Sequence, residues 1–148
     1  MQILVDEARC SGCRACELAC AARRGGPFGT AEARIRVVKV EADGVDRPSL
    51  CRQCPEAPCA EACPTGAIGM GGGRIRVSAD ECIVCPACAA ACPFDAVFSR
   101  PETGFPLICD LCDGAPACVE RCVTGALSLA RGGAGKQTAD SGAGGNLV

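Results

Sequence analysis

The chain has 148 residues and a formal net charge of −2, with 16 cysteines, four phenylalanines and no histidine, tryptophan or tyrosine. The balanced charge excludes the basic excess of a nucleic-acid-binding protein, and no apolar run reaches the roughly 18 residues that span a bilayer. Because so few aromatic side chains leave a thin apolar core, we expect the cysteines to hold this single small domain together through metal or disulfides.

Residues 1–6 contain no basic region and no long apolar segment, so they indicate a β-strand and not a signal peptide. We therefore expect a cytoplasmic protein. Thiols stay reduced in the cytoplasm, where densely spaced cysteines bind metal more often than they form disulfides.

Short runs with β-branched residues predict strands at residues 3–5, 35–40 and 75–77. The glycines at 71–73 fit the tip of a hairpin. From about Arg131 the chain is rich in glycine and small polar residues, so we expect residues 131–148 to form a flexible tail.

The cysteines form four groups of four. The first and third groups have the spacing C-x2-C-x2-C-x3-C, the second C-x2-C-x4-C-x3-C and the fourth C-x2-C-x5-C-x3-C. In every group, helix-forming residues fill the C-x3-C segment, which predicts one turn of helix. In chain order the groups are Cys10, Cys13, Cys16 and Cys20; Cys51, Cys54, Cys59 and Cys63; Cys82, Cys85, Cys88 and Cys92; and Cys109, Cys112, Cys118 and Cys122.

The flanks of the groups repeat as well. A short β-like run precedes the first and the third groups at the same distance, and the segment that begins at Cys63 matches the segment that begins at Cys122. We therefore expect one domain over residues 1–130 that contains two sequence copies, 1–70 and 71–130.

The tight spacing places three thiolates on one loop and a fourth on the following helical turn. Two-cluster bacterial ferredoxins use the run C-x2-C-x2-C-x3-C-P, in which the fourth cysteine ligates the neighbouring iron–sulfur cluster. The proline after the last cysteine is present in the second and third groups as Pro64 and Pro93, whereas Ala21 and Val123 follow the other two. Structural zinc, which usually takes separated C-x2-C pairs, a disulfide framework, and fewer clusters or a three-iron form are the alternatives.

With four complete motifs over residues 1–130, the chain resembles the bacterial ferredoxin family. More closely, it is similar to the four-cluster ferredoxin-like electron-transfer subunits of multi-subunit oxidoreductases, such as tungsten and molybdenum enzymes, carbon monoxide dehydrogenases and hydrogenases. The resemblance implies an α+β fold. In this fold, two ferredoxin-like modules of short β-hairpins and short helices surround four 4Fe-4S clusters.

The resemblance also implies that the first group pairs with the fourth and the second with the third. Carried over to this chain, the implied ligands are Cys10, Cys13, Cys16 and Cys122 for cluster a; Cys109, Cys112, Cys118 and Cys20 for cluster b; Cys51, Cys54, Cys59 and Cys92 for cluster c; and Cys82, Cys85, Cys88 and Cys63 for cluster d. The residues alone leave open a tandem pairing of group one with two and three with four.

We expect no catalysis by this chain. Without histidine there is no hydrolytic triad, and no dinucleotide-binding glycine motif follows a strand. The expected function is one-electron transfer for a large catalytic oxidoreductase subunit, with a tungsten aldehyde oxidoreductase as the first choice and a flavin- or NAD-reducing subunit as a second partner. The alternatives are a freely diffusing polyferredoxin, a self-associating conducting filament, and a metal-stabilised scaffold without redox work.

Charges near the cysteines lead to two further expectations. Arg14, Arg52 and Arg121 lie inside groups one, two and four and should favour the reduced clusters, whereas the uncharged third group should hold a cluster that is harder to reduce. A basic stretch is interpreted either as a solvated hairpin or as a docking face for an acidic partner. It consists of Arg23, Arg24, Arg34, Arg36 and Lys39.

Overall fold

The structure, a computed structural model, describes residues 1–25 and 29–130, so the predicted tail at 131–148 lies outside the described residues. Its elements are short. In chain order they are β1 (Gln2–Val5), η1 (Glu7–Arg9), α1 (Ala15–Arg23), β2 (Ile35–Val40), β3 (Val45–Leu50), α2 (Pro58–Glu61), β4 (Ile68–Gly71), β5 (Arg74–Val77), α3 (Ala87–Ala90), β6 (Phe98–Ser99), β7 (Pro106–Leu107), η2 (Leu111–Gly114), α4 (Ala117–Glu120) and β8 (Leu127–Ala130).

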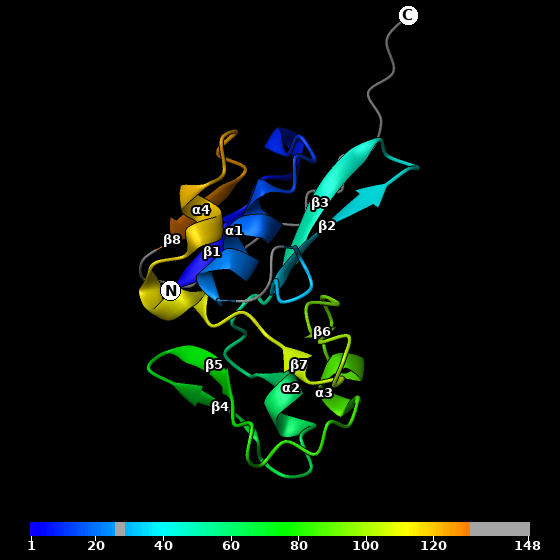
Figure 1. Cartoon of the computed structure of the whole chain (residues 1–148), viewed down its shortest axis with the longest axis vertical. Helices are drawn as coiled ribbons and strands as arrows, with labels where there is room; N and C mark the ends of the chain where they lie inside the picture. Colours follow the sequence, from blue (N-terminus) through cyan, green and yellow to red (C-terminus); the bar gives the residue numbers. More distant parts are fainter. Residues whose placement is uncertain (26–28, 131–148) are drawn as a thin grey trace, which may run out of the picture.

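The strands pair into two-stranded antiparallel sheets: β1 with β8, β2 with β3, β4 with β5, and β6 with β7. In the β1–β8 pair, which joins the two ends of the described chain, Ile3 lies opposite Leu129. Helix α1 packs against α4, and α2 packs against α3. The molecule therefore has two lobes, one with α1, α4 and the strands β1, β2, β3 and β8, the other with α2, α3 and β4 to β7 (Figure 1).

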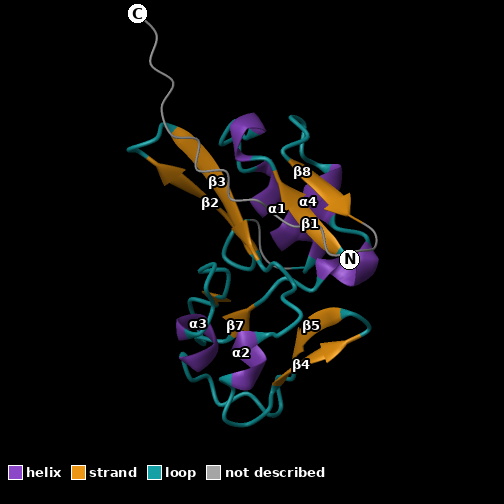
Figure 2. Cartoon of the chain, turned by 180° about the vertical axis from the view of Figure 1, so that it is seen from behind, coloured by secondary structure: helices purple, strands orange, loops and turns teal. Residues whose placement is uncertain are grey.

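This arrangement confirms the α+β fold with two small ferredoxin-like modules. The modules do not follow the order of the chain, because the first and last parts build one lobe and the middle part builds the other (Figure 2). The sequence copies 1–70 and 71–130 remain a prediction about the sequence, and in space each lobe combines parts of both.

The predicted strands are confirmed by β1, β2 and β5. The predicted hairpin tip is confirmed as well. Gly72 and Gly73 connect β4 to β5 with φ values of 61° and 73°. Positive φ at both central residues is what the tight two-residue turn of a twisted hairpin requires, and glycine adopts it without a Cβ clash.

The predicted helical turns between the last two cysteines of each group are confirmed, although three of them are short. Helix α1 contains both Cys16 and Cys20. Helices α2, α3 and α4 have four residues each and hold the third cysteine of their group, so that the last cysteine lies just past the helix end. Among the described residues, no helix has both the length and the apolar character needed to cross a membrane.

The core is built largely from cysteine. Eight of the 16 cysteines are buried, and none of the 16 forms a disulfide. They pack with aliphatic side chains such as Ile3, Ile35 and Leu50, which are almost fully buried. Glu17 is buried among them at 3% exposure and accepts a hydrogen bond of 2.5 Å from the backbone N–H of Val37, which ties α1 to β2.

Polar contacts join the two lobes at several points. Arg100, which follows β6, donates two hydrogen bonds of 2.7 Å to the carboxylate of Glu32, which precedes β2. The hydroxyl of Ser49 on β3 donates to the carbonyl of Phe94 at 3.3 Å. These contacts explain how a chain with such short elements keeps one orientation of its lobes.

Replacing Ile3 with alanine tests the role of the β1–β8 sheet. Ile3 is fully buried, so Ile3→Ala should destabilise the protein by about 2–5 kcal/mol. The matched control is Val38→Ala on β2, because Val38 is 50% exposed and should lose little. Anaerobic denaturant unfolding, followed by the visible absorbance of the bound metal, would measure the difference. Equal midpoints for the two variants would contradict this description of the core.

Candidate metal centre

The four cysteine loops share an unusual backbone feature. The residue just before the second cysteine of each group has a left-handed conformation, with φ between 53° and 67°; these residues are Gly12, Gln53, Val84 and Leu111. Only glycine adopts this conformation readily, and a β-branched valine resists it most. The conformation bends the loop back on itself, and the N–H groups of Gln53 and Leu111 thereby lie 3.4 and 3.5 Å from the sulfurs of Cys51 and Cys109.

The sulfur of the last cysteine in every group also has a polar neighbour. Backbone N–H groups of Arg34 and Ala96 donate to Cys20 and Cys92 at 3.3 and 3.4 Å. The hydroxyls of Thr65 and Thr124 lie 3.6 and 3.7 Å from Cys63 and Cys122. The repeated Cys-x-Thr-Gly segment thus has a physical role, since hydrogen-bond donors directed at sulfur stabilise its anionic, metal-bound form.

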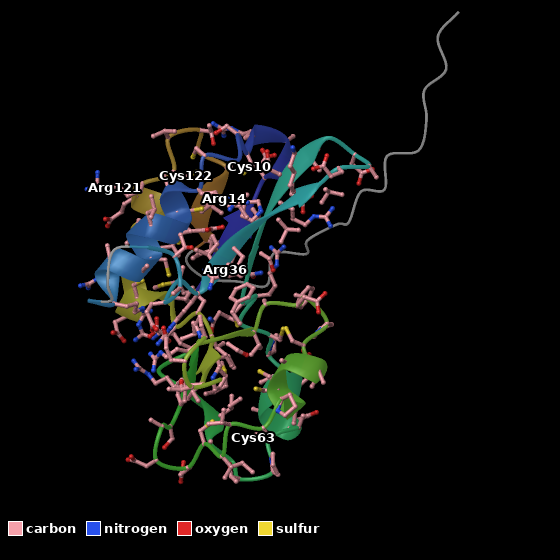
Figure 3. The ribbon with its side chains drawn as sticks, turned by 45° about the vertical axis from the view of Figure 1, so that its right-hand side comes forward. Cys10, Arg14, Arg36, Cys63, Arg121 and Cys122 are labelled. Atoms are coloured by element: carbon pink, nitrogen blue, oxygen red, sulfur yellow. The ribbon has the colours of Figure 1, made fainter. Side chains whose placement is uncertain are left out.

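In the first lobe, Cys10, Cys13, Cys16 and Cys122 line one cavity. The cavity combines three cysteines of the first group with the last cysteine of the fourth. In Figure 3, Cys10, Cys122 and Arg14 lie together in the lobe that contains α1 and α4.

In the second lobe, a cavity of similar size is lined by Cys51, Cys54, Cys59 and Cys92. Here three cysteines of the second group meet the last cysteine of the third. The guanidinium of Arg52 lies over the ring of Phe94, 5.8 Å from its centre, at the wall of this cavity.

The remaining cysteines come together in two further places. Cys20 lies close to the fourth group. Burial raises the pKa of Cys118, and the nearby charges of Cys109, Cys20 and Cys112 raise that pKa further, so Cys20 is a neighbour of Cys118. Cys82, Cys85 and Cys88 also lie close together, because after burial the first two raise the pKa of Cys88. Cys63 follows α2, which packs against the helix that carries Cys88.

Burial strongly disfavours charge on these thiols. It raises the pKa of Cys16, Cys51 and Cys109 to about 12, so at neutral pH they ionise only beside a positive centre. A single tetrahedral zinc ion with bonds of about 2.3 Å would draw its four sulfurs together and leave no cavity between them. Four thiols spread around an apolar cavity instead fit a larger, soft, positively charged group such as an iron–sulfur cubane.

An ion-pair network lies beside the fourth group. Asp110, whose side chain is 12% exposed, binds the guanidinium of Arg24, at the end of α1, and that of Arg34, just before β2, at 2.8 and 2.9 Å. Burial opposes ionisation of Asp110, but the hydrogen bond from Arg24 and the charge of Arg34 hold its pKa at about 2. The same carboxylate accepts the backbone N–H of Cys112 at 3.0 Å, so the network orients a candidate ligand loop.

These contacts correct the interpretation of the basic stretch. It was expected to be either a solvated hairpin or a docking face. For Arg24, Arg34 and Arg36 the solvated interpretation is wrong, because intramolecular partners hold the three side chains, whereas docking of an acidic partner stays a prediction. Arg36 donates to the carbonyls of Thr30 and Ala31 and lies over the Phe98 ring. Arg23, which is exposed, and Lys39, which pairs with Glu41 at 3.4 Å, remain on the surface.

The arginines inside the cysteine groups have different positions. Arg14 and Arg52 line the two cavities described above. Arg121 is exposed and projects from the outer edge of the first lobe (Figure 3). An effect of these charges on cluster potential stays a prediction, and its physical basis is stronger for Arg14 and Arg52.

Residues 43–131 match the protein family described as the 4Fe-4S dicluster domain. The chain belongs to this family. It is 41% identical over 122 residues to the polyferredoxin-like subunit of aliphatic sulfonate oxidoreductase from Pyrococcus furiosus, which covers 81% of this chain and 70% of the relative. It is 36% identical over 150 residues to the electron transport protein HydN of Escherichia coli, which covers 84% and 85% of the two chains.

Solved structures agree with these relatives. The active-site complex BamBC of benzoyl coenzyme A reductase contains a chain that matches 95% of this protein with 30% identity and a TM-score of 0.54, over 82% of that chain. The 4Fe-4S family and its relatives overturn the zinc, disulfide and scaffold alternatives. The chain is an iron–sulfur electron-transfer subunit of the kind found in oxidoreductase complexes, its 16 cysteines fit four 4Fe-4S clusters, and it is not itself the catalytic subunit.

Sequence analysis did not identify Glu17, Gln53 or Asp110, which are the buried polar residues of the core. Each lies within or beside a cysteine motif. No signal in the sequence separates them from solvated residues, because their partners lie 20 or more positions away in the chain.

Replacing Val84 with glycine tests the left-handed loop conformation. Val84 has a φ of 58°, so glycine should remove strain of about 1–2 kcal/mol, partly offset by the greater freedom of the unfolded chain. We expect Val84→Gly to slow anaerobic loss of iron to a chelator. The matched control is Ile83→Gly, because Ile83 is not left-handed and should only lose stability. Faster iron loss from Val84→Gly than from the unmodified chain would contradict the expectation.

Proposed function

We propose that the chain is a fixed subunit of an oxidoreductase complex and relays single electrons through clusters arranged in the order a, b, c, d. The single observation that carries the proposal is that cysteines from groups distant in sequence meet around common cavities, which suits shared ligation of neighbouring clusters. The proposed ligands are the four sets given under Sequence analysis.

The order within the first lobe rests on two helical segments. Helix α1 holds Cys16 of the first set and Cys20 of the second, and the α4 segment similarly connects Cys118 with Cys122. Each helical turn would therefore connect cluster a to cluster b. In the second lobe, the α2 and α3 segments would connect cluster c to cluster d in the same way.

The link between the lobes rests on Cys51 and Cys109. Burial raises the pKa of Cys109, and the charges of Cys20 and then Cys51 raise it further, so a proposed ligand of cluster c lies near a proposed ligand of cluster b. Clusters held in this order would form a row with a and d at its ends. Near these ends Cys13, Ile83 and Val84 are exposed, which suits electron entry and exit at the surface.

Each cluster, when bound, supplies reversible one-electron storage. The residues of the chain supply the surroundings. Apolar side chains such as Val37 and Ile108 keep water out of the cavity walls. Backbone N–H groups and threonine hydroxyls near the sulfurs stabilise the additional negative charge of a reduced cluster. The thiolate sets leave no open position for a substrate.

For the partner we propose a large catalytic subunit with tungsten or molybdenum, with a tungsten aldehyde oxidoreductase as the first choice and a flavin- or NAD-reducing subunit at the other end. The names of relatives support an oxidoreductase partner, since they include an aliphatic sulfonate oxidoreductase subunit and the electron-transfer subunit PhsB of a thiosulfate reductase from Salmonella typhi; the choice of metal rests on the resemblance stated under Sequence analysis. We also propose a cytoplasmic location, because free, buried thiols suit a reducing compartment.

Anaerobic purification of the tagged chain from its native host, followed by native mass spectrometry and metal analysis, tests this function. We expect a defined complex with a larger chain that contains tungsten or molybdenum. A chain that purifies alone and exchanges electrons with many partners would instead indicate a diffusing polyferredoxin. Open-ended assemblies of the chain with itself would indicate a conducting filament.

A further inference from the structure

Gln53 occupies the boundary between the two lobes. It lies in the second cysteine group, between Cys51 and Cys54, and its exposed fraction is only 9%. Its φ of 53° places it in the left-handed region, where residues other than glycine are uncommon. A buried amide in a strained conformation requires partners that compensate for its burial and strain.

Gln53 has three such partners. Its side-chain nitrogen donates to the carbonyl oxygen of Cys109 at 2.5 Å, and its side-chain oxygen accepts the backbone N–H of Ile75 at 2.8 Å. Its own N–H donates to the sulfur of Cys51 at 3.4 Å. One residue thus contacts a proposed ligand of cluster c through its backbone and a proposed ligand of cluster b through its side chain.

The other contacts between the lobes differ from this one. The Arg100–Glu32 pair, the pairs of Arg74 and Arg76 with Asp113, and the Ser49 hydroxyl involve no cysteine. Gln53 instead hydrogen-bonds both Cys51 and Cys109, at the one step in the proposed row that no helix supports. A side chain that holds these two loops together controls the separation of the two groups of ligands.

We propose that Gln53 is the positioning residue for electron transfer between clusters b and c. The inference rests on the ligand sets of the proposed function. Gln53 provides a path of covalent and hydrogen bonds between two proposed ligands. The path runs from the Cys51 sulfur to the Gln53 N–H, along the Gln53 side chain to its amide, and from there through the Cys109 carbonyl to the Cys109 sulfur. Electron tunnelling decays less steeply along covalent and hydrogen bonds than through gaps, so this path suits rapid exchange.

The step itself is a balanced one-electron exchange. With clusters bound by the two ligand sets, one electron would pass from the set that holds it to the other, so that one oxidation balances one reduction. No bond to Gln53 forms or breaks, and no proton is transferred. The contribution of Gln53 is geometric, because its amide fixes the Cys109 carbonyl and β5 relative to the Cys51 loop.

Two variants and one control test the inference on the full chain, loaded with iron and sulfide. Gln53→Glu keeps the shape and an acceptor for Ile75 but directs an oxygen at the Cys109 carbonyl, whereas Gln53→Met removes both side-chain hydrogen bonds. The control is Ser49→Ala, which removes a contact between the lobes that involves no cysteine. The readouts are iron and sulfide content, the magnetic interaction between reduced clusters in electron paramagnetic resonance, and the rate of electron redistribution after pulsed reduction.

We expect Gln53→Met and Gln53→Glu to retain the iron and sulfide of the unmodified chain, to lose the magnetic splitting of one neighbouring pair, and to redistribute electrons several-fold more slowly. Ser49→Ala should match the unmodified chain. Unchanged splitting and rate in both Gln53 variants would overturn the inference, as would loss of iron from both, because Gln53 would then serve assembly only. If the unmodified chain itself bound fewer clusters, the ligand sets would be at fault, which separates the two failures.

Discussion

A buried thiolate needs a positive centre beside it, and the architecture of this protein depends on that constraint. Eight cysteines lie in the core, and burial raises the pKa of several of them far above neutrality. The surrounding elements are too weak to fold alone, since one-turn helices and isolated two-stranded sheets are marginal in water. Iron therefore acts as part of the core, and the free energy of its binding contributes to the free energy of folding.

The distribution of cysteines between the groups explains why the first and last parts of the domain lie together. The last cysteines of the third and fourth groups lie just beyond a helical turn and line cavities with cysteines of another group: Cys122 meets the first group and Cys92 meets the second. The first group can meet the fourth only if the two ends of the domain come together. The β1–β8 sheet and the packing of α1 on α4 achieve this. Two lobes with a single boundary follow, and Gln53 and the Asp110 network lie close to it.

Much of this organisation could be predicted from the sequence because it is local. The β-branched runs predicted β1, β2 and β5, the adjacent glycines predicted the β4–β5 turn, and the C-x3-C spacing predicted the helical turns. The left-handed conformations of Val84 and Leu111 could not be predicted, because the geometry of the cysteine loops overrides their local preference. The partners of Asp110 and Gln53 could not be predicted either, since hydrogen bonds across 86 and 56 positions leave no periodic pattern. The solvated interpretation of the basic stretch was wrong for the same reason, because the carboxylate that binds Arg24 and Arg34 lies at the far end of the domain.

The central claim is that thiolates from distant groups share iron–sulfur clusters in a single row. The most direct test is an anaerobic crystal structure of the loaded chain, with anomalous diffraction recorded at the iron edge. We expect four compact iron sites in one line, with Cys122 bound to the cluster of the first group and Cys20 to that of the fourth. Ligation of the first group's cluster by Cys63, or a site occupied by zinc, would contradict the account.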